Sequence, residues 1–251
     1  MSKVKYGQMS KMKTETLEYR HDDVVFRGHL VHDPARTSEL PGVLIVHEAW
    51  GLGDFVKQRA EKLAEMGYVA MAVDMFGEAK QASTSEEGMG WTRALRADVP
   101  RLRGRILAAH EALLGCPQVD RARVASIGYC FGGTTSIELA RSGAPLAGVV
   151  SFHGSLATTH PAEPGAVKAK VLVCTGADDP FVPPAQVQGF VEEMTRAGAD
   201  YQVVIYGGSK HSFTNPKAAE RGVAGLEYNR MADQRSWSAM HAFFEEIFFR
   251  T

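Results

Sequence analysis

The chain has 251 residues, of which 45% are hydrophobic and 23% are charged, and its formal net charge is -1. These values are typical of a soluble globular protein with a substantial core. The near-neutral charge argues against nucleic acid or an anionic membrane surface as a partner, and no apolar run approaches the roughly 18 residues of a membrane span. Residues 1–13 contain scattered lysines without an apolar segment, so we expect a loosely ordered N-terminal extension and no secretory signal.

The cysteines are few and widely spaced. Cys116, Cys130 and Cys174 form no C-x-x-C pair, which argues against a disulfide framework or a structural zinc site. We therefore expect no structural metal and a reducing, cytoplasmic location. Cys174 lies in an apolar run typical of a core strand, and Cys116 follows a predicted helix just before Pro117.

Predicted strands and helices alternate along the chain. Residues 14–19 and 24–31 predict a leading antiparallel pair with a turn at 22–23. The later strands are predicted at 42–47, 68–73, 124–127, 147–152, 171–175 and 202–206, and the helices at about 55–66, 102–114, 131–141, 184–197 and 229–248, with Pro100 interrupting or restarting helical sequence. Short apolar strands that alternate with helices indicate an α/β fold, with a mostly parallel central sheet and helices on both faces. No linker or repeat divides the chain, so we expect one domain over residues 1–251.

The segment Val124-Ala-Ser-Ile-Gly-Tyr-Cys130-Phe-Gly-Gly133 predicts a strand, a sharp turn and a helix. Gly128 and Gly132 flank Cys130 two positions away on either side, which is the nucleophile-elbow pattern G-x-S-x-G with cysteine in place of serine. Glycine is favoured at both positions because the tight turn leaves no room for side chains. A thiolate at the start of a helix is stabilised by backbone N–H groups and by the helix dipole. Taken alone, the motif fits a buried structural cysteine equally well.

Two further polar motifs follow predicted strands. Gly176-Ala-Asp178-Asp179-Pro comes after strand 171–175, and Gly207-Gly-Ser-Lys-His211 comes after strand 202–206. Ligands of such sheets bind beyond the carboxyl ends of the strands, and the order nucleophile, acid, histidine is that of hydrolases built around this elbow. The order favours a triad over a surface histidine. We favour Asp179 as the acid, with Asp178 as the alternative.

The motifs Gly-Tyr-Cys130-Phe-Gly-Gly, Gly-Ala-Asp-Asp179-Pro-Phe-Val-Pro and Lys-His211-Ser-Phe together resemble the dienelactone hydrolase family of α/β-hydrolases. The resemblance extends from about residue 16 to 249. It implies the α/β-hydrolase fold and a cysteine nucleophile that needs no cofactor. It also implies that Glu48 contacts the resting thiol and that the N–H groups of Ala49 and Phe131 form the oxyanion hole.

One position departs from the family pattern. In dienelactone-cleaving members, an arginine four residues after the histidine binds the substrate carboxylate. In this chain that position is Asn215. An amide cannot supply a charged, two-pronged clamp. Either no carboxylate is bound, or a cation among Arg93, Arg96, Lys210 and Lys217 replaces the arginine.

The sequence therefore predicts a carboxymethylenebutenolidase-like hydrolase whose partner is a small-molecule ester or lactone. Cys130, Asp179 and His211 are its expected catalytic residues, and Trp50 and Asn215 are expected to contact the substrate. The competing hypotheses are a general carboxylesterase or thioesterase and a non-catalytic binding protein that keeps the hydrolase scaffold.

Overall fold

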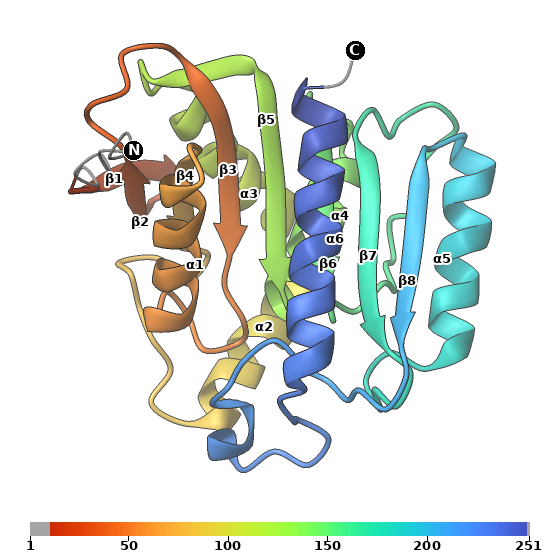
Figure 1. Ribbon diagram of the computed structural model, residues 1–251. Coiled ribbons are helices and arrows are strands. Elements are labelled where there is room, and N and C mark those ends of the chain that lie inside the picture. Colours follow the sequence, from red (N-terminus) through yellow and green to blue (C-terminus); the bar gives the residue numbers. More distant parts are fainter. Residues whose placement is uncertain (1–10, 250–251) are drawn as a thin grey trace, which may run out of the picture.

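A computed structural model describes residues 11–249 (Figure 1). The strands are β1 Lys13–His21, β2 Val24–His32, β3 Leu40–Val46, β4 Val69–Val73, β5 Val119–Tyr129, β6 Gly148–Phe152, β7 Lys170–Gly176 and β8 Tyr201–Tyr206. The helices are α1 Asp54–Glu65, α2 Ser85–Ala97, α3 Val99–Leu114, α4 Phe131–Arg141, α5 Pro184–Ala197, the short 3₁₀ helix η1 Ala218–Arg221 and α6 Arg230–Phe249. The predicted alternation of strands and helices is confirmed.

All these strands join one sheet in the order β1-β2-β4-β3-β5-β6-β7-β8. The predicted antiparallel pair is β1 and β2, with its turn at residues 22–23. β2 is also antiparallel to β4, and every pairing from β4 to β8 is parallel. The parallel strands therefore bring their carboxyl ends to one edge of the sheet. In Figure 1, α2 and the loop containing η1 lie at this edge.

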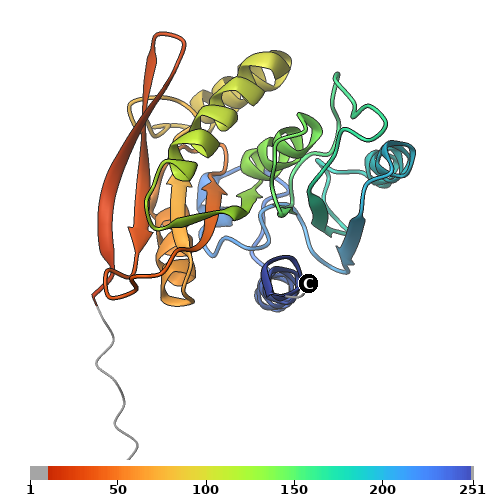
Figure 2. The same cartoon turned by 90° about the horizontal axis from the view of Figure 1, so that it is seen from above.

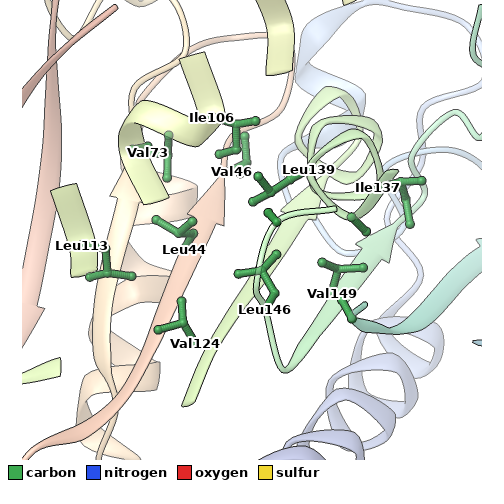
Figure 3. Close-up of a cluster of buried hydrophobic side chains, with 14 of the residues drawn as sticks. Leu44, Val46, Val73, Ile106, Leu113, Val124, Ile137, Leu139, Leu146 and Val149 are labelled. Carbon is green, nitrogen blue, oxygen red and sulfur yellow. The ribbon is translucent and has the colours of Figure 1, made fainter. Parts of the chain in front are cut away.

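Helices cover both faces of the sheet. Seen from above in Figure 2, α1 and α6 lie on one face, and α3, α4 and α5 lie on the other. Side chains of β3 alternate between the two layers. Leu44 packs into the layer that contains Ile106 and Leu139 (Figure 3), while Ile45 packs into the layer that contains Val56. Burial on both faces explains why β3 is a continuous apolar run.

Two helix boundaries follow from local sequence. Gly67, just after α1, has a φ of +99°, a conformation that glycine adopts with little strain. Helical sequence breaks at Asp98, and α3 restarts with Pro100 in its first turn, where proline costs no backbone hydrogen bond. The Asp98 side chain accepts a hydrogen bond from the Arg101 N–H at 3.1 Å, so the break is capped.

The predicted N-terminal extension falls largely outside the described residues, which begin at residue 11. Lys13 is already the first residue of β1 and pairs with His32. Within residues 11–249, no helix is long and apolar enough to cross a membrane.

We expect Leu44→Ala to lower the free energy of unfolding by roughly 2–5 kcal/mol, because Leu44 is fully buried and its truncation leaves a cavity. Met231→Ala is the control, since Met231 is 52% exposed and its truncation should change the value by less than about 0.5 kcal/mol. Denaturant unfolding measures both. Equal effects of the two substitutions would contradict this packing.

Candidate active site

Cys130 occupies the sharp turn between β5 and α4. Its φ of 56° and ψ of -115° lie in a region that a residue with a side chain rarely adopts. Such strain persists only where the surrounding structure fixes it, and it concentrates at functional sites. The helix begins at the next residue, Phe131, so the thiol lies at the positive end of the α4 dipole.

The two flanking glycines are required by backbone contacts. A Cβ atom on Gly128 would lie 2.0 Å from the carbonyl oxygen of Gly132, and a Cβ atom on Gly132 would lie 2.1 Å from the carbonyl oxygen of Val46 in β3. Both distances are far shorter than van der Waals contact. The turn at Cys130 therefore forms only with glycine at these two positions.

His211 and Asp179 meet at the carboxyl edge of the sheet. His211 Nδ1 lies 2.8 Å from Asp179 Oδ2, and both side chains are buried. The other Asp179 oxygen accepts the Phe181 N–H at 2.8 Å, which orients the carboxylate. Asp178 is exposed. Of the two candidate acids, the fold therefore brings Asp179 to the histidine.

The charge of Cys130 acts directly on His211. Burial by itself lowers the pKa of the imidazole, but the negative charge of Cys130, together with hydrogen bonds to Cys130 and Asp179, raises the pKa of His211 to about 10. Because Nδ1 bonds to Asp179, the nitrogen that faces Cys130 is Nε2. The arrangement thus favours the charged imidazolium form of His211 beside Cys130.

A second histidine, His153, supports the turn through hydrogen bonds. His153 Nδ1 accepts the Cys130 N–H at 3.1 Å, and its Nε2 lies 2.8 Å from the Thr214 hydroxyl. Burial, and then the positive charge of His211, lower the pKa of His153 well below its ordinary value. His153 is therefore a neutral imidazole that holds both the Cys130 backbone and the loop after His211.

Cys130 and His211 open into a cavity of about 260 Å³. Ala49 and Phe131 also line it, and within residues 11–249 neither of their N–H groups donates to another group of the protein. Both are therefore free to bind an oxygen atom beside the thiol. Trp50 lines the same cavity, and its ring lies 4.7 Å from the Arg221 guanidinium.

Glu48 is buried, and its carboxylate is held by the loop after His211. It accepts hydrogen bonds from the Ser212 hydroxyl at 2.9 Å and from the Asn215 amide at 2.5 Å. Burial raises the pKa of the Glu48 carboxyl despite these two bonds. The side chain lines a separate pocket of about 160 Å³. Its expected contact with the resting thiol stays a prediction.

The residues considered as substitutes for a carboxylate clamp have different positions. Arg96 lines the catalytic cavity, whereas Lys217 lines the pocket beside Glu48 and Lys210 pairs with Glu227. Asn215 lines that second pocket as well and is committed to Glu48 and to the Lys217 N–H. A direct contact between Asn215 and substrate stays a prediction.

Several residues near the thiol were not predicted from the sequence. Phe181 and Ser212 lie within or beside the motifs that contain Asp179 and His211, so a signal for them existed. Met89 and Thr92 come from α2, which does not follow a strand end directly, and the strand-end rule gives no signal for it. Within residues 11–249, no cluster of three or more histidine, cysteine or acidic side chains is arranged to hold a metal ion.

The chain is similar to several known proteins over most of its length. A family model described as the dienelactone hydrolase family matches residues 26–248. The solved structure named m3DLH is 39% identical with a TM-score of 0.90, covering 94% of this chain and 99% of that one. P91, a dienelactone hydrolase-like promiscuous phosphotriesterase from metagenomic libraries, is 38% identical with a TM-score of 0.88, covering 94% and 98%. A putative carboxymethylenebutenolidase of Methylorubrum extorquens is 28% identical over 72% of this chain and 65% of that protein.

The imidazole of His211 should titrate near pH 10 in the wild-type protein and well below that value in Cys130→Ala, because only burial and Asp179 then act on it. A raised pKa stabilises the fold fully below pH about 6.5, and this contribution is lost as the pH rises through about 10. Heteronuclear NMR of the ring measures both titrations. Cys116→Ala is the control, and an identical midpoint in Cys130→Ala would contradict the pairing.

Proposed function

The chain belongs to the dienelactone hydrolase family, and on that premise we propose that it hydrolyses a small-molecule ester or lactone with Cys130 as its nucleophile. Hydrolysis of ester or lactone bonds is the activity of the family. The observation that carries the proposal is the strained turn at Cys130, which faces His211 in the cavity that two free backbone N–H groups also line.

In the first half of the reaction, Cys130 Sγ attacks the carbonyl carbon. The oxyanion that forms is bound by the N–H groups of Ala49 and Phe131, which are fixed before the substrate arrives. The bond to the leaving oxygen then breaks as His211 Nε2 gives it a proton. Asp179 keeps the imidazole in the required tautomer and stabilises its charge.

In the second half, water hydrolyses the thioester. His211, now neutral, takes a proton from water, and the hydroxyl attacks the acyl carbon within the same oxyanion hole. The carbon–sulfur bond breaks, the carboxylic acid leaves, and Cys130 returns as a thiolate beside the imidazolium. Every proton is moved by His211, so the residues present suffice for the cycle.

The position of Glu48 bears on the charge of the nucleophile. A carboxylate against the sulfur would oppose its ionisation. Here Ser212 and Asn215 hold both Glu48 oxygens, and the charge that interacts with Cys130 is that of His211. A reduced thiol also suits a reducing compartment, and we propose the cytoplasm as the location.

A second candidate activity is phosphotriester hydrolysis. P91, named a promiscuous phosphotriesterase, is 38% identical to this chain over nearly its whole length. Attack by Cys130 on phosphorus would use the same oxyanion donors. General carboxylester hydrolysis, thioester hydrolysis and ligand binding without catalysis are the competing functions that the same scaffold permits.

A panel of chromogenic substrates separates these functions. We expect the wild-type protein to hydrolyse simple aryl esters or lactones and Cys130→Ala to be inactive. Phosphotriester turnover without ester turnover would favour the second candidate. The absence of all turnover, with a folded protein, would favour the binding protein.

Asp179→Asn should lower kcat by several orders of magnitude, because the histidine loses both tautomer control and charge stabilisation. The adjacent Asp178→Asn is the matched control and should leave kcat within about twofold, since Asp178 is exposed. Steady-state kinetics on one ester measures both, and the reverse ranking would assign the triad to Asp178.

Brief alkylation should modify Cys130 ahead of the other two thiols and abolish ester hydrolysis. Cys174 is fully buried, and burial raises the pKa of its thiol to about 12, while burial also raises the pKa of the Cys116 thiol. Peptide mass spectrometry locates the label. Loss of activity with label confined to Cys116 or Cys174 would exclude Cys130 as the nucleophile.

A further inference from the structure

A second hollow adjoins the catalytic cavity. It has a volume of about 580 Å³ and is lined by side chains of α2 and α3 between residues 89 and 102, by Thr134 and Glu138 of α4, and by residues 157–159. Four residues, Met89, Thr92, Arg96 and Thr134, line both spaces. The two spaces therefore adjoin each other, and we call the second one the α2 groove.

The α2 groove leaves the cavity on the side away from His211. Phe181 and Leu226, which contact or pair with His211, line the catalytic cavity and not the groove. The leaving oxygen must lie within reach of His211 to receive its proton. The leaving group therefore occupies the His211 side, and the acyl part of an ester extends toward the groove.

The walls of the groove are largely apolar, with Met89, Val99 and Leu102 among them. The carboxylate of Glu138 lies at the groove but is fully neutralised. It pairs with Arg103 at 2.8 Å and with Arg141 at 2.8 Å, and its side chain is 2% exposed. The groove thus offers no free negative charge to a ligand.

Two guanidinium groups at the groove lack an acidic partner. Arg93 and Arg96 both line the groove and are exposed. Arg96 donates one hydrogen bond to the Ser155 hydroxyl at 2.8 Å, which fixes its direction and leaves its other N–H groups available. No ion pair joins either residue to a carboxylate within residues 11–249. They are placed to bind an anion on an apolar chain.

We propose that the α2 groove is an acyl-binding subsite for elongated substrates, in which an apolar acyl chain lies along the groove and a terminal carboxylate binds Arg93 and Arg96. The proposal rests on the proposed ester hydrolysis at Cys130 and adds a substrate class, the esters of long-chain dicarboxylic acids. It places the carboxylate several carbons away from the reacting carbonyl, at the part of the groove that Arg93 and Arg96 line.

Three p-nitrophenyl esters test the subsite: the butanoate, the octanoate and the half-ester of octanedioic acid. Chain length should raise kcat/KM of the wild-type protein by about two- to fourfold for each methylene group that the groove buries. The half-ester should exceed the octanoate by about three- to tenfold at low ionic strength, and salt should reduce this preference because both arginines are exposed.

Variants test separately the preference for a long acyl chain and the preference for a terminal carboxylate. The double variant Arg93→Gln/Arg96→Gln should bring the ratio of half-ester to octanoate close to one. Ala157→Trp, which fills the groove, should bring the ratio of octanoate to butanoate close to one. Arg196→Gln, an exposed arginine in α5, is the matched control and should change neither ratio.

A binding measurement makes the subsite testable without turnover. Calorimetry of octanedioate with Cys130→Ala should show binding that the two arginine substitutions weaken at least fivefold. Binding that depends on the arginines in a chain that hydrolyses no ester would support the groove and overturn the ester-hydrolase function. Hydrolysis of the butanoate with no preference for length or charge, and octanedioate binding unaffected by the substitutions, would overturn the groove and keep the function.

Discussion

The close approach of backbone atoms around Cys130 is the constraint on which the site depends. The carbonyl of Gly132 occupies the space of a Gly128 side chain, and the Val46 carbonyl occupies that of a Gly132 side chain. This packing joins β5 to α4 so tightly that Cys130 takes a positive φ. The same contact holds the end of β3 against the start of α4, so that the Ala49 and Phe131 N–H groups, which come from different elements, face one cavity.

The polar side chains that follow the other strands are held by buried hydrogen bonds. His153 accepts the Cys130 N–H and bonds to Thr214, while Ser212 and Asn215 hold Glu48. The loop that carries His211 is thus tied to the ends of β3, β5 and β6. A buried carboxylate with two donors costs less than an unpaired one, so these two bonds stabilise the loop in its position.

The sequence predicted the features that depend on local rules. It did not predict the positions of side chains that depend on packing between distant segments. Glycine spacing, apolar runs and strand-end motifs were sufficient to predict the parallel sheet, the turn at Cys130 and the pairing of an acid with His211. The sequence favoured Asp179 over Asp178 only as a preference, and the structure shows the hydrogen bond between Asp179 and His211. No local signal distinguishes Arg96, which reaches the cavity, from Lys217, which does not, because their positions depend on how α2 and the loop after His211 cross the sheet edge. The extent of the domain over residues 1–251 stays a prediction.

The candidate reacting groups and the groove differ in how firmly the sheet fixes them, and this difference bears on substrate specificity. The reacting groups lie on strand ends and on the start of α4, where the sheet and its glycine contacts leave little freedom. The groove is formed by α2, by the first turns of α3 and by residues 157–159, which pack on the sheet edge without belonging to it. Substitutions there change the length and charge of the space without moving Cys130, His211 or the two N–H groups. Asn215, the position that departs from the family pattern, lines the pocket beside Glu48 and not the groove, so a change at this position alters the loop side of the site and leaves the groove walls unchanged.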